Sequence, residues 1–229
     1  GPVEGKRFLD VGCGGGSLSM MVAQMVGEDG HVTGVDFDGK IICLAAEQAA
    51  ARGISNISFH ALDAMAIDYE AGFDIVYARF LLSHLTQPAQ LIDRMIRALK
   101  PGGRLIVEDI DFSGHFCYPP SRDFEFYLQY FTTAARNNGQ NPDIGLSLYS
   151  MLKDTQLNDV QFSLVQPSHR SGQGKWMGYY TMDRIKDTVI KQGLATADDV
   201  AAVLRNLEAY TKSENTIISL PRVFRAWGY

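Results

Sequence analysis

A glycine-rich turn between a short apolar run and a helical segment constrains this chain most. Residues Phe8 to Ser17 read FLDVGCGGGS, so a strand runs into a tight turn and then into a helix that starts near Leu18. Glycines have no Cβ and leave the backbone open to a ligand, while the free N–H groups of the next helix suit an anion. The turn therefore predicts a nucleotide site in an α/β fold.

The spacing of the glycines indicates which nucleotide is bound. Gly12 and Gly14 fit the start of the dinucleotide fingerprint G-x-G-x-x-G, but Ser17 stands where the third glycine is required. The pattern is G-x-G-x-G, ending at Gly16, and Asp10 precedes it by two residues. A carboxylate there would repel a pyrophosphate and would suit an ammonium and a sulfonium. Charge therefore favours S-adenosylmethionine (SAM) over NAD.

The first half of the chain alternates apolar runs with helical segments, which is typical of βαβ units and a parallel sheet. Strands are expected over residues 7–12, 31–36, 57–63, 73–78 and 104–109, and helices over 18–26, 39–52 and 88–100. The fold class that follows is α/β, with a doubly wound, mostly parallel seven-stranded sheet of the Rossmann-like type.

The regular alternation of strands and helices ends after Asp111. Helices are expected over residues 121–138, 145–154, 182–192 and 197–212, and strands over 160–166 and 216–227. One domain, 1–229, accounts for the pattern, with insertions at 112–145 and 168–213 that form a helical substrate lid after strands five and six. Residues 169–180 hold three glycines and suit a mobile flap.

Two further acids end neighbouring strands. Asp36 closes the second strand, 20 residues after Gly16, where a carboxylate can accept hydrogen bonds from ribose hydroxyls. Asp63 closes the third, where its side chain or the backbone of Asp63-Ala64 can meet an adenine amino group. Either Asp alone is as easily a helix cap. The ordered set of loop and two acids in one βαβαβ unit favours a nucleotide site.

These residues resemble the class I SAM-dependent methyltransferases, in the branch of the ubiquinone/menaquinone-biosynthesis type. The matching stretches are FLDVGCGGG (8–16), GVDFD (34–38), ALDA (61–64), FDIVYARFLLSHL (73–85) and LKPGGRLIVED (99–109). The N-terminal helices that commonly close over the cofactor in this family do not appear, and residues preceding this segment are expected to be absent here. The stretch after Asp111 matches no specific activity.

The resemblance implies a set of cofactor-binding residues. On the methionine part of SAM and around it, these are Asp10, Gly12, Cys13, Gly14 and Gly16. On the ribose, the adenine and the methyl side, they are Asp36, Phe37, Asp63, Ala64, Ala78 and Arg79.

The methyl acceptor decides whether a general base is needed. An oxygen or acidic carbon needs one, whereas a neutral amine or a thiolate does not. His84 is the first candidate because it follows strand four, near where the methyl group should emerge, and His115 in the loop after strand five is the second. For each, a packed or surface imidazole is an equally good interpretation. His169, Tyr118 and Asp111 are weaker candidates.

Eight aromatic residues lie between Phe112 and Phe131. They predict either a lid that cages a planar apolar acceptor and shields the sulfonium, or a helix stripe, since Phe124, Tyr127 and Phe131 recur at i, i+3 and i+7. Those three are interpreted as mainly core. The candidates for substrate contact are Phe80, Phe112, Phe116, Tyr118, Trp176 and Tyr180.

Composition limits the kinds of partner that the chain is expected to bind. The net charge is −5 and no run of Lys and Arg is present, so nucleic acid and anionic membranes are poor partners. No apolar run approaches the roughly 18 residues of a membrane span. Cys13, Cys43 and Cys117 form no CxxC pair, so neither a disulfide framework nor a metal site is expected. A cytoplasmic location and a small-molecule partner are expected; the oligomeric state is left open.

The leading hypothesis is a methyltransferase that acts on oxygen, carbon or nitrogen of a small apolar or aromatic molecule. A non-catalytic SAM sensor or partner subunit is an alternative that no residue excludes. An NAD-dependent oxidoreductase is less favoured because of Ser17 and Asp10. The Asn/Asp-Pro-Pro-Tyr/Phe signature of adenine- and glutamine-directed N-methyltransferases is replaced by YARF at 77–80.

Overall fold

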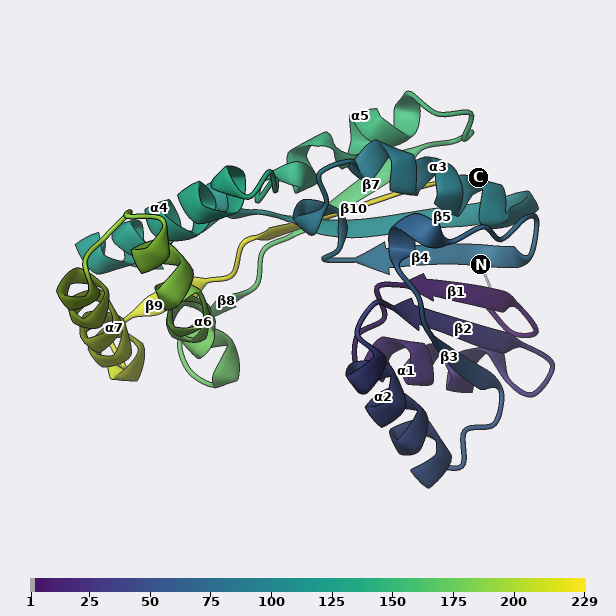
Figure 1. Ribbon diagram of the computed structural model, residues 1–229, viewed down its shortest axis with the longest axis horizontal. Helices are drawn as coiled ribbons and strands as arrows, with labels where there is room; N and C mark the ends of the chain where they lie inside the picture. Colours follow the sequence, from purple (N-terminus) through teal and green to yellow (C-terminus); the bar gives the residue numbers. More distant parts are fainter. Residues whose placement is uncertain (1–2) are drawn as a thin grey trace.

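One seven-stranded sheet forms the centre of the molecule (Figure 1). Its strands are β1 (Arg7–Val11), β2 (His31–Asp36), β3 (Ile57–Ala61), β4 (Phe73–Arg79), β5 (Leu99–Asp111), β7 (Gln161–Val165) and β10 (Arg222–Gly228). The order is β3-β2-β1-β4-β5-β10-β7, and only β10 runs antiparallel to its neighbours. The structure, a computed structural model, describes residues 3–229. The predicted α/β fold with a mostly parallel seven-stranded sheet is confirmed.

Helices cover the sheet from both sides, as a doubly wound fold requires (Figure 1). On one side are α1 (Ser17–Val26) and α2 (Gly39–Ala51), and on the other α3 (Pro88–Ala98) and α5 (Leu148–Lys153). Side chains alternate along a strand, so Phe8 packs in one cluster with Val26 of α1, whereas Leu9 packs in another with Leu91 of α3. The sheet is held between two apolar layers.

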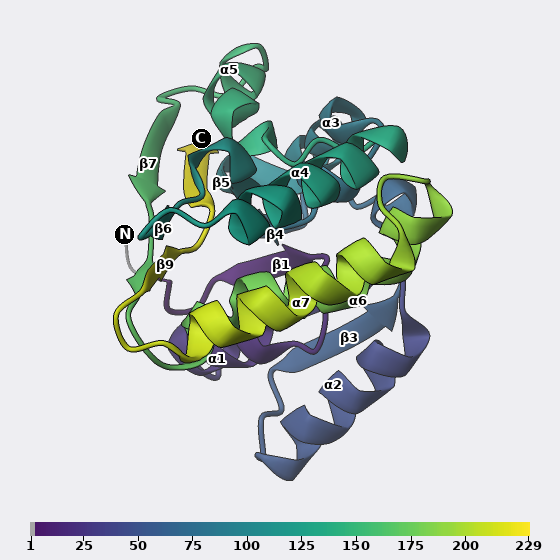
Figure 2. The same cartoon turned by 90° about the vertical axis from the view of Figure 1, so that its left-hand side faces the viewer.

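A second helical group lies across the carboxyl ends of the parallel strands (Figures 1 and 2). It consists of α4 (Arg122–Asn137), α6 (Met177–Lys191) and α7 (Ala197–Lys212). These helices come from the two predicted insertions and share a core of their own, in which Tyr127, Met182 and Leu207 are almost completely buried. We call this group the helical layer. It forms a wall opposite the strand ends.

The second insertion is more ordered than the sequence predicts. Helix α6 begins at Met177 instead of residue 182, and a short 3₁₀ helix, η5 (Gln173–Trp176), precedes it. The predicted flap at 169–180 is therefore largely helical. Burial explains the difference, because Gly178 packs against Tyr127 and the Lys175 amino group donates a hydrogen bond of 2.5 Å to the Ser213 carbonyl oxygen.

The predicted closing strand, 216–227, is two strands. β9 (Ile217–Ser219) joins a small antiparallel sheet with β6 (Cys117–Tyr118) and β8 (Ser168–His169), and only β10 continues the main sheet. Pro221 lies at the break, where it has no N–H to donate to a ladder. The small sheet thereby ties the first insertion to the second.

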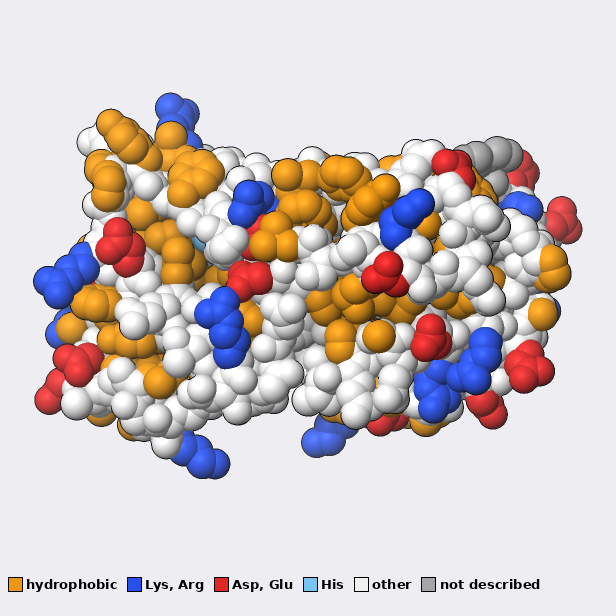
Figure 3. Space-filling view, turned by 90° about the horizontal axis from the view of Figure 1, so that it is seen from above, with side chains coloured by type: hydrophobic (Ala, Val, Ile, Leu, Met, Phe, Trp, Pro, Cys, Tyr) orange, Lys and Arg blue, Asp and Glu red, His pale blue; other side chains and the backbone are white. Residues whose placement is uncertain are grey.

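Acidic and basic side chains are interspersed on the face shown in Figure 3. Within the described part of the chain, no helix has the length and apolar character needed to cross the hydrocarbon core of a membrane. Nor do residues 3–229 contain a group of three or more His, Cys, Asp or Glu side chains placed to hold a metal ion.

Candidate functional site

The glycine turn lies at the carboxyl end of β1 and leads directly into α1. Its last glycine, Gly16, has a φ of +70°, a backbone conformation that side chains other than glycine rarely adopt. A Cβ at Gly16 would lie only 2.5 Å from the ring of Phe59 on β3. A Cβ at Gly14 or Gly15 would meet nothing within 4 Å. The turn is closely packed on the sheet side and open on the side where a ligand would bind.

The Asp36 carboxylate holds this turn in place. The Gly14 N–H donates to Asp36 Oδ2 at 2.9 Å, and the Asp38 N–H donates to Oδ1 at 3.1 Å. Each carboxylate oxygen still has a free acceptor position. The acid predicted to bind a ribose is thus half-buried beside the glycine turn, with its position fixed by the backbone.

Asp10 lies deeper than predicted. Its side chain is buried, and the Ser19 hydroxyl donates to Asp10 Oδ2 at 2.5 Å. Burial raises the pKa of Asp10 to about 6, the Ser19 hydrogen bond works against that rise, and the neighbouring Asp36 charge adds to it. The residue predicted to border a ligand therefore lies beneath the turn, buried against Ser19.

The residues predicted for the adenine end stand at the same edge of the sheet. Phe37 is 80% exposed and borders a shallow depression at the start of α2. Asp63 accepts a hydrogen bond of 2.8 Å from the Met65 N–H and begins a short 3₁₀ helix, η1 (Ala64–Ala66). The interpretation of Asp63 as a cap is correct, and its exposed side chain still lies next to Ala64 at the strand end.

The two residues predicted to line the methyl side lie on opposite faces of β4. Ala78 has no exposed surface and its side chain belongs to the core on the α3 side, so only its backbone remains to border a ligand. Arg79 points to the other face, where it forms an ion pair of 3.7 Å with Glu108. Its guanidinium lies 4.6 Å from the centre of the Phe80 ring. Strand alternation decides both placements.

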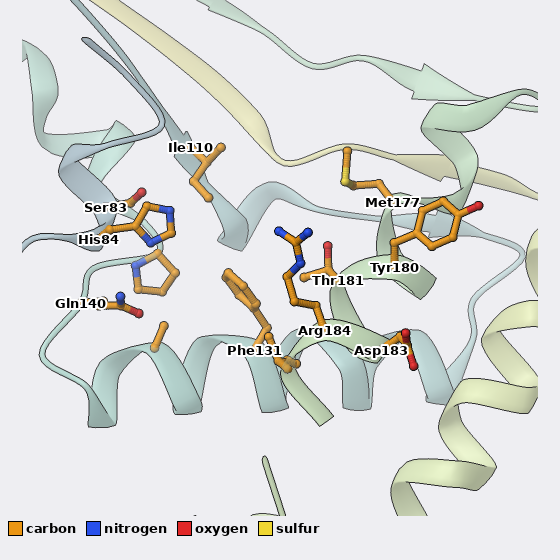
Figure 4. Close-up of a pocket in the computed structure, with 13 residues that line it drawn as sticks. Ser83, His84, Ile110, Phe131, Gln140, Met177, Tyr180, Thr181, Asp183 and Arg184 are labelled. Atoms are coloured by element: carbon orange, nitrogen blue, oxygen red, sulfur yellow. The ribbon is translucent and has the colours of Figure 1, made fainter. Parts of the chain in front are cut away.

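A cavity of about 850 Å³ separates the sheet edge from the helical layer (Figure 4). Its lining comes from the segment after β4, the end of β5, α4 with the loop that follows, and α6. The residues are Ser83, His84, Ile110, Phe131, Ala135, Gln140, Pro142, Met177, Tyr180, Thr181, Asp183, Arg184 and Ile185.

This cavity borders the glycine turn through a single short segment. A Cβ at Gly12 would lie 3.0 Å from Leu81 Cδ2, and Leu81 directly precedes the 3₁₀ helix η2 (Leu82–His84). Fully buried Asp109 anchors η2 by accepting a hydrogen bond of 3.0 Å from the Ser83 N–H. Burial raises the pKa of Asp109, and backbone hydrogen bonds work against that rise. Leu81 therefore lies between the glycine turn and η2, whose His84 lines the cavity.

Of the two predicted bases, only His84 lines the cavity. His115 is 6% exposed and packs edge-on against Phe124 and Tyr127, with both ring nitrogens lacking a hydrogen-bond partner among residues 3–229. Burial lowers the pKa of His115 to about 3, so the ring is neutral at pH 7. It does not line the cavity, and its burial among aromatic rings fits the packed imidazole that the sequence equally allows.

Of the predicted substrate residues, too, only some line the cavity. Tyr180 lines the cavity, whereas Phe80, Phe112, Phe116, Tyr118 and Trp176 do not. Phe112 is buried and stacks on Phe131, with ring centres 4.0 Å apart. Phe131, which we interpret from sequence as core, packs against the core of the helical layer and also forms part of the cavity wall. The i, i+3, i+7 pattern predicts the helix that contains Phe131. It does not predict that another face of this helix borders a cavity.

Arg184 is the functional candidate that sequence reasoning misses. It lies in the middle of α6, where a lone Arg is normally a solvated surface residue. Its guanidinium points into the cavity in Figure 4. No local signal identifies such a residue, because its position depends on how α6 packs against α4 and the sheet edge.

The fold and the site together define a nucleotide-binding α/β protein. An open glycine turn, an acid at the end of β2 and a neighbouring cavity all lie at the carboxyl edge of a parallel sheet, where this class binds its ligands. The chain belongs to the family described as "Methyltransferase domain", which it matches over residues 2–177. The resemblance predicted from the sequence is confirmed.

Curated relatives include quinone-biosynthesis enzymes. The ubiquinone biosynthesis O-methyltransferase of Xylella fastidiosa (strain 9a5c) is 36% identical over 111 residues, which are 48% of this chain and 44% of that protein. The demethylmenaquinone methyltransferase of Shouchella clausii (strain KSM-K16) is 36% identical over 103 residues, 44% of each chain. The match therefore spans less than half the length of either relative.

Solved structures share the fold. Phosphoethanolamine N-methyltransferase 2 of Haemonchus contortus, in complex with phosphomonomethylethanolamine and S-adenosylhomocysteine, superposes with a TM-score of 0.59 at 18% identity. The superposition covers 98% of this chain and 49% of that one. At this identity the likeness concerns the fold alone.

Proposed function

We propose that this chain binds SAM at the glycine turn and transfers its methyl group to a small molecule held in the neighbouring cavity. The observation that carries the proposal is the glycine turn itself, tied to the Asp36 carboxylate by the 2.9 Å hydrogen bond from Gly14 and open on its outer side. The relatives named as methyltransferases support it.

The charges at the turn fit SAM better than a dinucleotide. Asp10 lies beneath the turn and Asp36 beside it, so the local field is negative. A pyrophosphate would be repelled, whereas the ammonium and sulfonium of SAM would be attracted. In this proposal Asp36 accepts hydrogen bonds from the ribose, Phe37 covers the adenine, and Asp63 with Ala64 meets the adenine edge.

The cavity supplies the remaining requirements. SAM brings an activated methyl group, so the protein has to align the acceptor and exclude water. The apolar side chains of Ile110, Phe131 and Met177 line the cavity, which suits a small apolar or aromatic acceptor. His84, held by η2 at the boundary, is placed to take a proton from an acceptor oxygen or carbon.

We expect calorimetry to show binding of SAM and S-adenosylhomocysteine and no binding of NAD. SAM should bind more tightly above pH 6 than below it, by roughly tenfold, because its sulfonium and ammonium favour ionised Asp10; the step should be smaller for S-adenosylhomocysteine, which has no sulfonium. The step should follow the pKa of Asp10, which is about 6 in the free protein. Binding of NAD without binding of either nucleoside would show that the proposal is wrong.

Replacing Asp10 by Asn provides the control for that pH step. The pKa of Asp10 is raised on folding from 3.8 to about 6, so the free protein loses stability as the pH rises through this window. Asp10→Asn should therefore raise the free energy of unfolding above pH 6 while weakening nucleoside binding there. If the pH step in binding persists in this variant, Asp10 is not its source.

Replacing His84 by Gln should lower methyl transfer by about 10²- to 10⁴-fold if His84 is the general base. The assay follows label from SAM into small molecules of a cell extract, and calorimetry checks that S-adenosylhomocysteine still binds. His60→Gln is the matched control, because His60 is an exposed histidine on β3 that does not line the cavity. Unchanged transfer by His84→Gln would exclude this role.

The same assay separates an enzyme from a SAM sensor. A sensor would bind both nucleosides and label no compound in any extract, whereas an enzyme labels its acceptor. A cytoplasmic location and the absence of a nucleic-acid partner are also part of the proposal; the free thiols of Cys13, Cys43 and Cys117 and the net charge of −5 support them.

A further inference from the structure

Two charged side chains, Asp183 and Arg184, line the cavity. Arg184 points its guanidinium into the space between Phe131 and Thr181 (Figure 4). Among residues 3–229, Arg184 has no hydrogen-bond or ion-pair partner. The carboxylate of Asp183, by contrast, is paired with a lysine of the same helix. Lys186 contacts Asp183 at 2.8 Å. Asp187 does not line the cavity. Arg184 is therefore an unpaired cation on the cavity wall.

The surroundings of Arg184 are largely apolar. Ile110, Phe131, Met177 and Ile185 contribute hydrocarbon surface to the same space. Arg184 is itself exposed, so an oxyanion that enters the cavity can reach its guanidinium. A guanidinium also presents paired N–H donors that match the two oxygens of a carboxylate or a phosphate.

We infer that the methyl acceptor carries a carboxylate or phosphate group, which binds Arg184 while the apolar part of the molecule lies against Phe131 and Met177. This inference rests on the proposed function. A purely cationic acceptor would be repelled by Arg184, and a neutral one would gain nothing from its charge. The acceptor is therefore an amphipathic acid.

The positions of His84 and Arg184 give the acceptor an orientation. His84 lies on η2 beside the glycine turn, while Arg184 comes from α6 on the opposite wall (Figure 4). The oxyanion group of the acceptor would lie toward α6, and its methyl-accepting atom toward η2. The helical layer thus selects the substrate, and the sheet edge binds the cofactor.

Matched pairs of probes test this inference. 2-Naphthoate is compared with 2-naphthamide, and 2-naphthyl phosphate with 2-naphthol, by calorimetry on the protein with and without S-adenosylhomocysteine. We expect at least one acid to bind about tenfold more tightly than its neutral counterpart, corresponding to about 1.4 kcal/mol. The pair with the larger ratio distinguishes a carboxylate site from a phosphate site.

Arg184→Gln should abolish the preference for the acid, whereas Arg205→Gln should keep it. Arg205 is a matched control because it is an exposed arginine of α7 that does not line the cavity. Equal binding of acid and neutral probe by the unaltered protein, or an undiminished preference in Arg184→Gln, would overturn the inference. Binding of S-adenosylhomocysteine is measured in every variant, so failure of the proposed cofactor site is recognised separately.

Discussion

Replacing Asp36 by Asn is expected to weaken the binding of S-adenosylhomocysteine by roughly 100-fold. The variant keeps the size of the side chain but loses the charge that strengthens hydrogen bonds to two ribose hydroxyls, each worth about 1.5–3 kcal/mol. An amide can also offer an acceptor oxygen to only one of the two backbone N–H groups, those of Gly14 and Asp38, that the carboxylate now receives. Calorimetric titration of the unaltered protein and the variant measures the effect.

Asp68→Asn is the control for this experiment. Asp68 is exposed in the loop between β3 and β4, and none of the hydrogen bonds or ion pairs at the turn involves it. It should leave the dissociation constant unchanged. Circular dichroism shows whether Asp36→Asn retains the fold. A folded Asp36→Asn protein that binds the nucleoside as tightly as the original would remove Asp36 from the site.

The second large effect is expected for Gly16→Ala, which should lower the free energy of unfolding by roughly 2–5 kcal/mol. Part of the loss is backbone strain at a φ of +70° and part is overpacking, since the new Cβ would lie 2.5 Å from the Phe59 ring. The ring has little room to move because it also lies against Gly34. Urea denaturation measures the change.

Two variants separate strain from overpacking. Gly53 has a φ of +68° with nothing within 4 Å of its added Cβ, so Gly53→Ala should cost only the backbone strain, about 1 kcal/mol. Adding Phe59→Leu to Gly16→Ala should recover part of the loss by shortening the side chain in the way. Equal losses for Gly16→Ala and Gly53→Ala would mean that Phe59 moves aside freely.

The sequence alone determined the parallel part of the sheet and the placement of the glycine turn and two acids at its carboxyl edge. Each βαβ unit is a local pattern of apolar runs, turns and helix starts, and parallel strands bring their carboxyl ends to one edge. Gly16, Asp36 and Asp63 were therefore predicted correctly at that edge from their places in the chain. The relative positions of these three residues depend on the order of the strands. Few strand orders are available, because crossovers between parallel strands are almost always right-handed.

Only the tertiary structure decided the acceptor half. His84 and His115 both follow a strand, yet one lines a cavity and the other is buried among aromatic rings. Phe131 and Arg184 belong to different insertions, and they face the same space only because α4 and α6 pack together across the strand ends. The physical reason is that a helix pattern specifies one apolar face, while the contents of a cavity depend on which other faces close it. Such contacts join residues far apart in the chain and leave no local signal.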